Sequence, residues 1–158
     1  MQETMTNSKN RQALWGLPDP DLQGEFYADI PVKRGVAWIL DTVFIVAVTL
    51  LVVLLTVGIG FFFFGFILLV VGFIYRSVTI ANKSSTWGMR LVAIELRNHR
   101  GERLDTGTAL LHTLGYTLSM SFVFPQLLSI ILMMTGARAQ GLTDMILGTA
   151  AINRDARA

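Results

Sequence analysis

Hydrophobic positions in this chain gather into three long runs separated by polar segments. The first two runs include the 41 residues between Arg34 and Arg76, of which only Asp41 carries a charge. A bilayer crossing needs only about 20 apolar residues. The pattern therefore predicts two membrane-spanning helices joined by a tight turn, the first ending before Gly58 and the second covering residues 61–80.

Asp41 does not prevent the first helix from entering a bilayer. Fifteen Val, Ile, Leu and Phe residues lie between Gly35 and Val57. Each favours insertion by roughly 0.3 to 0.6 kcal/mol, against a cost of about 3 kcal/mol for a central Asp. Asp41 is also only seven residues beyond Arg34, which is about 10 Å along a helix. The apolar residues therefore outweigh the acid.

The third run, residues 107–136, contains no Lys, Arg, Asp or Glu but has Pro125 near its middle. A continuous helix of that length would extend about 45 Å, and proline kinks or breaks a helix interior. The run is predicted either to cross once with a kink or to enter the membrane and return. The basic residues that follow it favour the return, because positive charge marks the cytoplasmic side.

The segment between the second and third runs, residues 81–106, is polar and basic. Its cations are Lys83, Arg90, Arg97, Arg100 and Arg103. This segment and the N-terminus are therefore expected to be cytoplasmic. Within it, the apolar residues Val92, Ile94 and Leu96 alternate with other residues, a pattern typical of a strand, and residues 149–152 are a candidate partner strand.

The predicted fold is an all-α integral membrane protein with a short cytoplasmic β element. It consists of a two-helix transmembrane hairpin plus a third apolar segment broken by proline. Three regions are expected: an extended N-terminal tail over residues 1–30, a membrane domain over residues 31–152 and a C-terminal tail over residues 153–158. In the N-terminal tail, Trp15, Phe26 and Tyr27 are candidates for the lipid headgroup level.

Small side chains recur every seven residues along both helices of the hairpin. They are Gly35, Thr42, Thr49 and Thr56 in the first helix, and Gly58, Gly65, Gly72 and Thr79 in the second. Helices in lipid associate where small side chains let their backbones approach closely, and a period near 3.5 residues favours left-handed packing. We therefore expect the two rows of small residues to face each other.

Composition agrees with a membrane protein and excludes several other classes. The chain is 53% hydrophobic and 15% charged, against roughly 25% charged residues in soluble domains. Its net charge of +2 comes from cations beside apolar runs, so no nucleic-acid partner is expected. The absence of cysteine excludes disulfides and thiolate chemistry. No nucleophile with a base, phosphate loop or metal-ligand spacing occurs, so no enzyme activity, cofactor or metal site is expected.

Three blocks of the sequence resemble the RDD family, which is named after one Arg and two Asp. The first block is YADIPVKRGVAWILD, with Arg34 and Asp41 in the named positions. The middle block is STWGMRLVAIELRNHRGERLDTGTALLH, and the last is QGLTDMILGTAAI, with Asp144 as the second Asp. The chain departs from the family pattern at His112, where Arg is usual, and at Thr143, where His is usual.

The resemblance implies a small polytopic protein of the bacterial inner membrane whose usual suggested role is transport of unidentified ligands. With His112, the three named residues Arg34, Asp41 and Asp144 are predicted to form a functional polar cluster in the cytoplasmic half of the bilayer. The expected partners of Asp41 are Arg34, seven residues away on the same helix face, and His112, at a similar depth.

Two interpretations of this cluster remain open. Asp41 is either a structural charge that fixes helix register or a carrier of a proton or cation, since an acid within the membrane is a functional candidate. For Asp144, the preceding Thr143 suggests ordinary helix-start chemistry, a hydroxyl cap with an acid in the first turn.

Two functions follow from these interpretations. In the first, a homo-oligomer transports a proton, cation or small ligand through the cluster, because so few helices cannot enclose a pathway alone. In the second, the chain is an accessory or assembly subunit of a larger membrane complex with no transport activity of its own.

Overall fold

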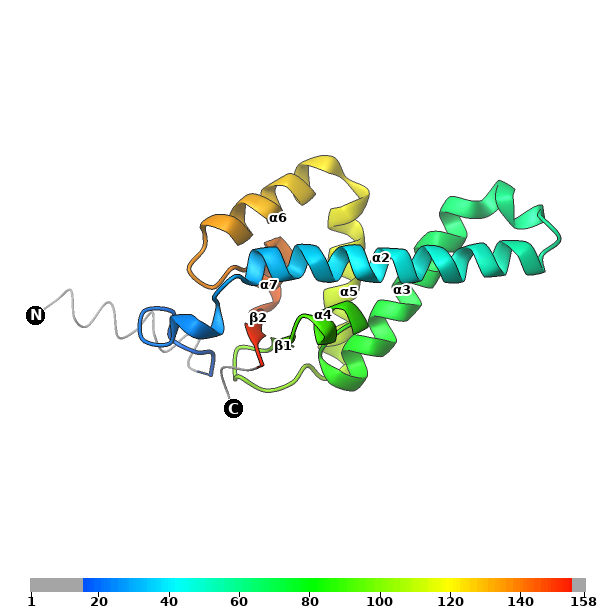
Figure 1. Cartoon of the computed structure of the whole chain (residues 1–158). Coiled ribbons are helices and arrows are strands. Elements are labelled where there is room, and N and C mark those ends of the chain that lie inside the picture. Colours follow the sequence, from blue (N-terminus) through cyan, green and yellow to red (C-terminus); the bar gives the residue numbers. More distant parts are fainter. Residues whose placement is uncertain (1–15, 155–158) are drawn as a thin grey trace, which may run out of the picture.

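The computed structural model describes residues 16–154, and most of them are helical (Figure 1). The elements are, in order, the 3₁₀ helix η1 Gly24–Phe26, α2 Ile30–Leu55, the 3₁₀ helix η2 Ile59–Phe63, α3 Phe64–Lys83, α4 Trp87–Leu91, β1 Ile94–Arg97, α5 Thr106–Ser121, α6 Val123–Thr135, α7 Leu142–Leu147 and β2 Ala150–Asn153.

The predicted hairpin is confirmed, because α2 and α3 are both long and apolar enough to cross a membrane. Pro31 lies in the first turn of α2, where a missing N–H costs no helical hydrogen bond. The chain reverses at Val57 and Gly58, which adopt left-handed φ values of 55° and 84°. Glycine takes this conformation without steric cost, which explains why the turn falls there.

Small residues pack between α2 and α3 at some of the predicted positions. Thr49 is fully buried, and a Cβ added to Gly72 would lie 3.7 Å from Ile45. At Gly35 and Gly65, by contrast, an added Cβ would meet no heavy atom within 4 Å. The prediction that the two rows of small residues face each other therefore does not hold at these two glycines.

Other members of the two rows also differ from the prediction. Gly58 lies in the turn instead of in a helix. Thr56 is exposed and Thr42 is only partly buried, whereas Thr49 is fully buried. The physical reason is that a seven-residue period drifts by about 20° per repeat around a straight helix, so a row this long cannot stay in one interface.

Helices α5 and α6 come from the third apolar run and meet at an angle of 116°. The break is at Phe122, whose backbone is extended, and Pro125 lies in the first turn of α6. A proline ring clashes with the carbonyl four residues earlier when a helix continues through it. Pro125 therefore explains why α5 ends at Ser121.

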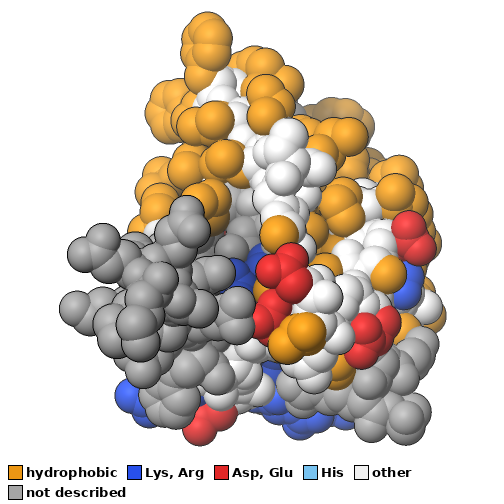
Figure 2. Space-filling view, turned by 90° about the vertical axis from the view of Figure 1, so that its left-hand side faces the viewer, with side chains coloured by type: hydrophobic (Ala, Val, Ile, Leu, Met, Phe, Trp, Pro, Cys, Tyr) orange, Lys and Arg blue, Asp and Glu red, His pale blue; other side chains and the backbone are white. Residues whose placement is uncertain are grey.

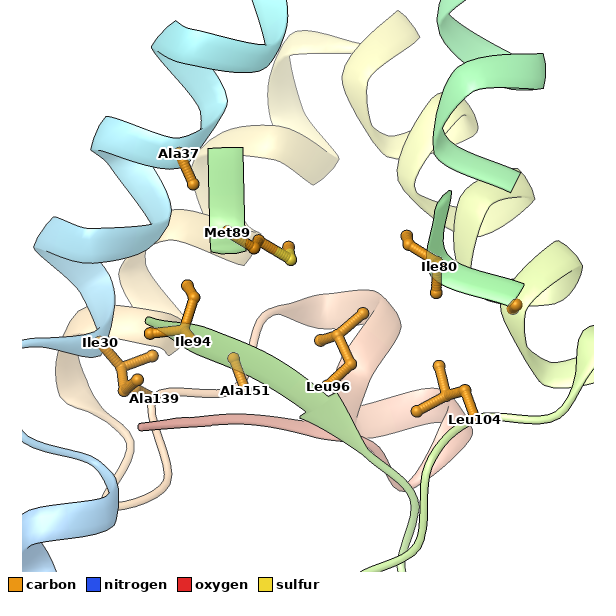
Figure 3. Packing of buried hydrophobic residues seen from close by; sticks show 10 residues of the cluster. Ile30, Ala37, Ile80, Met89, Ile94, Leu96, Leu104, Ala139 and Ala151 are labelled. Atoms are coloured by element: carbon orange, nitrogen blue, oxygen red, sulfur yellow. The ribbon is translucent and has the colours of Figure 1, made fainter. Parts of the chain in front are cut away.

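Strands β1 and β2 form a two-stranded antiparallel sheet in which Ile94 pairs with Asn153 and Arg97 with Ala150. A hydrophobic core packs above this sheet against α2, α3 and α4 (Figure 3). Ile30, Ile94 and Leu96 in this core are fully buried. The sheet thus ties the segment after α3 to the C-terminal end of the described chain.

The described residues before α2, 16–29, are folded, although the sequence predicted an extended tail. Leu17, Phe26 and Tyr27 are buried against Ala150 and Ile152 of β2. Phe26 and Tyr27 therefore belong to this small core instead of the lipid headgroup level. The prediction for Trp15 falls outside the described residues. Because β2 lies over one hundred residues away in sequence, no local pattern indicated this packing.

Apolar and charged side chains occupy different parts of the molecule. In Figure 2, hydrophobic side chains gather on the upper part of the face shown and most charged side chains on the lower part. The turn between α2 and α3 lies at the end of the molecule opposite η1 and the sheet (Figure 1). Large hydrophobic side chains are exposed at this turn, including Val57 and Phe62 at 91% and 90%. This distribution suits a protein surrounded by lipid.

Candidate functional site

Two buried carboxylates form the centre of the candidate site. Asp41 lies in the middle of α2 and Asp144 in the first turn of α7, and each is 1% exposed. A buried charge is costly unless it is paired and hydrogen-bonded. Each acid is indeed enclosed by its own set of donors.

The carboxylate of Asp41 accepts three hydrogen bonds from elements that follow it in the chain. The Tyr75 hydroxyl of α3 donates at 2.6 Å and the Thr86 hydroxyl at 2.6 Å. The backbone N–H of Gly88 in α4 donates at 2.9 Å. Thr86 also caps α4 by accepting a bond from the N–H of Met89. Asp41 thereby fixes α4 against α2.

The cation beside Asp41 is Arg76 of α3. A guanidinium nitrogen of Arg76 lies 3.6 Å from the carboxylate. The same guanidinium stacks over the ring of Tyr116 in α5, 4.4 Å from the ring centre, a favourable cation–π geometry. The Tyr116 hydroxyl in turn accepts a 2.8 Å hydrogen bond from the indole N–H of Trp38. Arg76 therefore connects α2, α3 and α5.

The carboxylate of Asp144 has a second, separate set of partners. Arg34 of α2 forms an ion pair with it, and His112 Nε2 of α5 lies 2.9 Å away. The Thr149 hydroxyl donates at 2.9 Å and the backbone N–H of Gly141 at 3.0 Å. This acid therefore joins the start of α2, the middle of α5 and the segment leading into β2.

The position of Asp144 follows from the local structure of α7. The residue before the helix is Gly141, so Thr143 lies inside the first turn and is not the cap that its sequence position suggested. Burial alone would raise the pKa of Asp144, but the Arg34 guanidinium and the His112 hydrogen bond together hold this pKa below its usual range. Asp144 is thus an ionised member of a buried ion pair.

The structure changes the predicted pairing within the polar cluster. Arg34 and His112 were expected to neutralise Asp41, and this pairing is wrong because both contact Asp144. Asp41 pairs with Arg76 instead. The reason is the hairpin: α3 returns alongside α2 and brings its own cation to the acid, whereas Arg34 lies nearly two turns away on the same helix.

All four predicted cluster residues nevertheless line one cavity. Its volume is about 520 Å³ and its walls are mainly apolar side chains of α2, α5 and α6. Arg34, Asp41, His112 and Asp144 reach it, and Arg76 and Tyr116 join them. The two ion pairs are therefore separate in their hydrogen bonds but share a single internal space.

Two polar atoms on this wall have no hydrogen-bond partner among the described residues. They are His112 Nδ1 and Thr113 Oγ1, and both residues are at least 95% buried. Buried polar groups are normally satisfied. Both atoms are themselves enclosed by protein, so these residues line the cavity with other atoms.

Several site residues were missed by sequence reasoning, above all Arg76. A signal for it existed: Asp41 lies 17 residues before Gly58 and Tyr75 lies 17 residues after it. In an antiparallel hairpin, positions equally distant from the turn lie side by side. Arg76 had been used only to mark the end of the apolar run. The bond from Thr86 had no comparable signal.

Among residues 16–154, no three His, Cys, Asp or Glu side chains are grouped to hold a metal ion. The donor sets described above consist of hydroxyls, backbone N–H groups, guanidinium groups and an imidazole. The arrangement can form ion pairs and hydrogen bonds, and it can hold a polar group within an apolar enclosure.

Comparison with known proteins gave one match. The model of the RDD family matches residues 30–148, which include both ion pairs and every helix from α2 to α7. No curated protein and no solved structure matches the chain.

Proposed function

The chain belongs to the RDD family, and on this basis we propose that it is an integral membrane protein that binds a small ligand in the central cavity and transports it as an oligomer. The observation that carries this proposal is the convergence of both buried ion pairs on one space of about 520 Å³. Charged residues inside membrane proteins usually face a cavity and mark ligand pathways.

A small ligand fits the cavity better than a bare proton or metal cation. Each carboxylate already accepts three or more bonds from protein donors, which leaves little capacity for a cation. The volume also lies within the roughly 300 to 1,000 Å³ typical of small-molecule sites. The transported species is therefore proposed to be a molecule of several heavy atoms.

The topology proposed with this function is re-entrant for α5 and α6. Strands β1 and β2 belong to one sheet, so residues 94–97 and 150–153 must lie on the same side of the membrane. The chain between them can then cross an even number of times only. With 16 and 13 residues, α5 and α6 are about 24 and 20 Å long, shorter than the roughly 30 Å hydrocarbon core.

The basic loop and the sheet are proposed to lie on the cytoplasmic side of a bacterial inner membrane. The support is the positive charge of residues 81–106, since cytoplasmic loops are enriched in Lys and Arg. The turn at residues 56–60 would then reach the opposite side. Because two crossings and one re-entrant pair cannot surround a pathway, the transporting unit is proposed to be a homo-oligomer.

The test is native mass spectrometry of the protein purified in mild detergent, with a pair of matched tryptophan variants. Gly35 lines the cavity and Gly65 does not, and at both positions an added side chain meets open space. We expect a homo-oligomer that carries a small non-protein molecule, and we expect this molecule to be lost in Gly35→Trp but kept in Gly65→Trp. A fixed-stoichiometry complex with another protein and an empty cavity would instead support the accessory-subunit function.

A further inference from the structure

The two arginines of the cavity retain hydrogen-bonding capacity that their partners do not use. A guanidinium group has five N–H donors. Among the described residues, Arg34 donates one side-chain hydrogen bond, to Asp144. Arg76 donates none shorter than 3.5 Å and contacts Asp41 only at 3.6 Å. Both arginines line the same space, so the N–H donors that their protein partners do not use are candidates for bonds to a molecule bound there.

The cavity presents its positive charges more than its negative charges. The side chains of Arg34 and Arg76 are 14% and 11% exposed, whereas those of Asp144 and Asp41 are both 1% exposed. The carboxylates are covered by hydroxyl and backbone donors. A bound molecule therefore meets guanidinium nitrogens before carboxylate oxygens.

The rest of the wall is mainly apolar and can adapt its shape. Met120, Ile130 and Met133 contribute to it from α5 and α6, and methionine side chains adjust readily to different shapes. Helix α6 packs on α5 and α7 and stands apart from α2 (Figure 1). At the rim, Val32 of α2 is 67% exposed and Met134 of α6 is 72% exposed. A hydrocarbon chain can therefore pass between α2 and α6 along side chains that are mainly apolar.

From these features we infer that the cavity binds a single-chain amphiphilic anion. Its carboxylate or phosphate head contacts Arg34 and Arg76, and its hydrocarbon tail lies along the methionines of α6. Guanidinium groups recognise such oxyanions through paired, charge-assisted hydrogen bonds. The inference rests on the proposed function, since it names the chemical class of the ligand that the cavity holds.

The test uses the full chain in phosphatidylcholine nanodiscs, with dodecyl phosphate as the probe and native mass spectrometry as the readout. We expect one dodecyl phosphate per protomer. Dodecanol has the same chain without the charge, and we expect it to bind at least roughly tenfold more weakly because charge-assisted bonds are lost. Dodecyltrimethylammonium, the matched cation, and inorganic phosphate, the head without a chain, are expected to show no binding.

Variants identify where the probe binds. Arg34→Lys and Arg76→Lys keep the positive charge beside each acid but lose the planar fork, so we expect each to weaken binding of dodecyl phosphate while the thermal unfolding midpoint shows that the protein remains folded. Gly35→Trp fills the cavity without removing a charge and should abolish binding. Gly65→Trp on the outer face of α3 should bind as the unmodified protein does.

A further measurement distinguishes a single-chain anion from a bilayer lipid with an anionic phosphate head. Nanodiscs that contain phosphatidylglycerol offer a two-chain lipid with an anionic head. We expect this lipid not to displace dodecyl phosphate, and displacement would overturn the single-chain assignment in favour of a bilayer lipid. Equal binding of dodecanol and dodecyl phosphate, or unchanged binding in Gly35→Trp, would overturn the inference. An oligomer that retains another small molecule but rejects dodecyl phosphate would overturn it while leaving the proposed function intact.

Discussion

At the scale of single residues, the oxygen atoms of both buried carboxylates accept hydrogen bonds from protein donors, which offsets the cost of burying two charges. Asp41 is held by Tyr75, Thr86 and Gly88 and faces Arg76. Removing one partner from a buried ion pair leaves an uncompensated charge, which typically costs about 3–5 kcal/mol. The cost of losing both partners together is smaller, because no isolated charge remains.

This non-additivity gives a prediction for Asp41 and Arg76. Asp41→Asn and Arg76→Gln are each expected to lower the free energy of unfolding by about 3–5 kcal/mol, and the double variant by clearly less than the sum. Denaturant unfolding in detergent micelles measures all three. Asp105→Asn is the control: Asp105 is an exposed cap of α5, and Asn caps equally well, so little change is expected. Strict additivity would show that the two side chains do not interact.

A second prediction concerns the pH dependence that Asp144 confers. Its pKa is lowered in the folded protein by Arg34 and His112, while in the unfolded chain it titrates near about 3.9. As the pH falls, the unfolded chain therefore takes up the proton first. The stability contributed by this group is complete above about pH 4 and is lost below it as the pH falls towards the folded pKa.

Thermal unfolding midpoints between pH 3 and pH 7 measure this effect. The midpoint of the unmodified protein is expected to fall more steeply below about pH 4 than that of Asp144→Asn, which has no proton to gain at this position. Parallel curves for the two proteins would contradict the assignment. Comparing the two slopes cancels the contributions of the other acids.

At the scale of elements, the short helix α4 packs closely against α2 at Gly88. A Cβ on Gly88 would lie 2.3 Å from the backbone oxygen of Ala37 and 2.9 Å from the carboxylate of Asp41. The backbone of Ala37 cannot move aside for an added Cβ as the end of a flexible side chain could. The close approach also allows the N–H of Gly88 to reach Asp41. One small residue thus determines whether α4 can dock.

We therefore expect Gly88→Ala to destabilise the protein by about 1–3 kcal/mol or more, as overpacking does in a filled interior. Gly24→Ala is the matched control, because an added Cβ there meets nothing within 4 Å; its effect should stay within about 0.5 kcal/mol. Denaturant unfolding measures both. Equal effects would mean that α4 can shift away from α2 at little cost.

The elements also show which features of the fold could be predicted from the sequence. The apolar runs, the turn at Gly58 and the break caused by Pro125 are consequences of local chemistry and could be read directly. The pairing of Asp41 with Arg76 could not be read from helix periodicity, because the partner lies on another helix. The folded segment before α2 was missed for the same reason: Phe26 is covered by β2.

At the scale of the whole molecule, the sheet constrains the path of the chain through the membrane. The pairing of β1 with β2 supports the proposed topology, in which the third apolar run returns to the side from which it entered. A single kinked crossing would place the two strands on opposite sides of the bilayer and separate them.

Single cysteines test this topology, since the chain has none of its own. Arg103→Cys and Arg154→Cys, both at exposed positions, are expected to react with a membrane-impermeant maleimide from the same side of sealed vesicles. Ile59→Cys in the turn should react from the opposite side only. Labelling of Arg103→Cys and Arg154→Cys from opposite sides would establish a single crossing by α5 and α6.

The sequence by itself determined that this chain enters a membrane, where its helices turn and break, and which residues carry charge inside the apolar segments. These properties depend on hydrophobicity, proline and glycine, which act over a few residues. Only the tertiary structure decided that Asp41 belongs with Arg76, that Asp144 belongs with Arg34 and His112, and that both pairs share one cavity. The physical reason is that buried charges are neutralised by whichever group the packing of distant helices brings within reach.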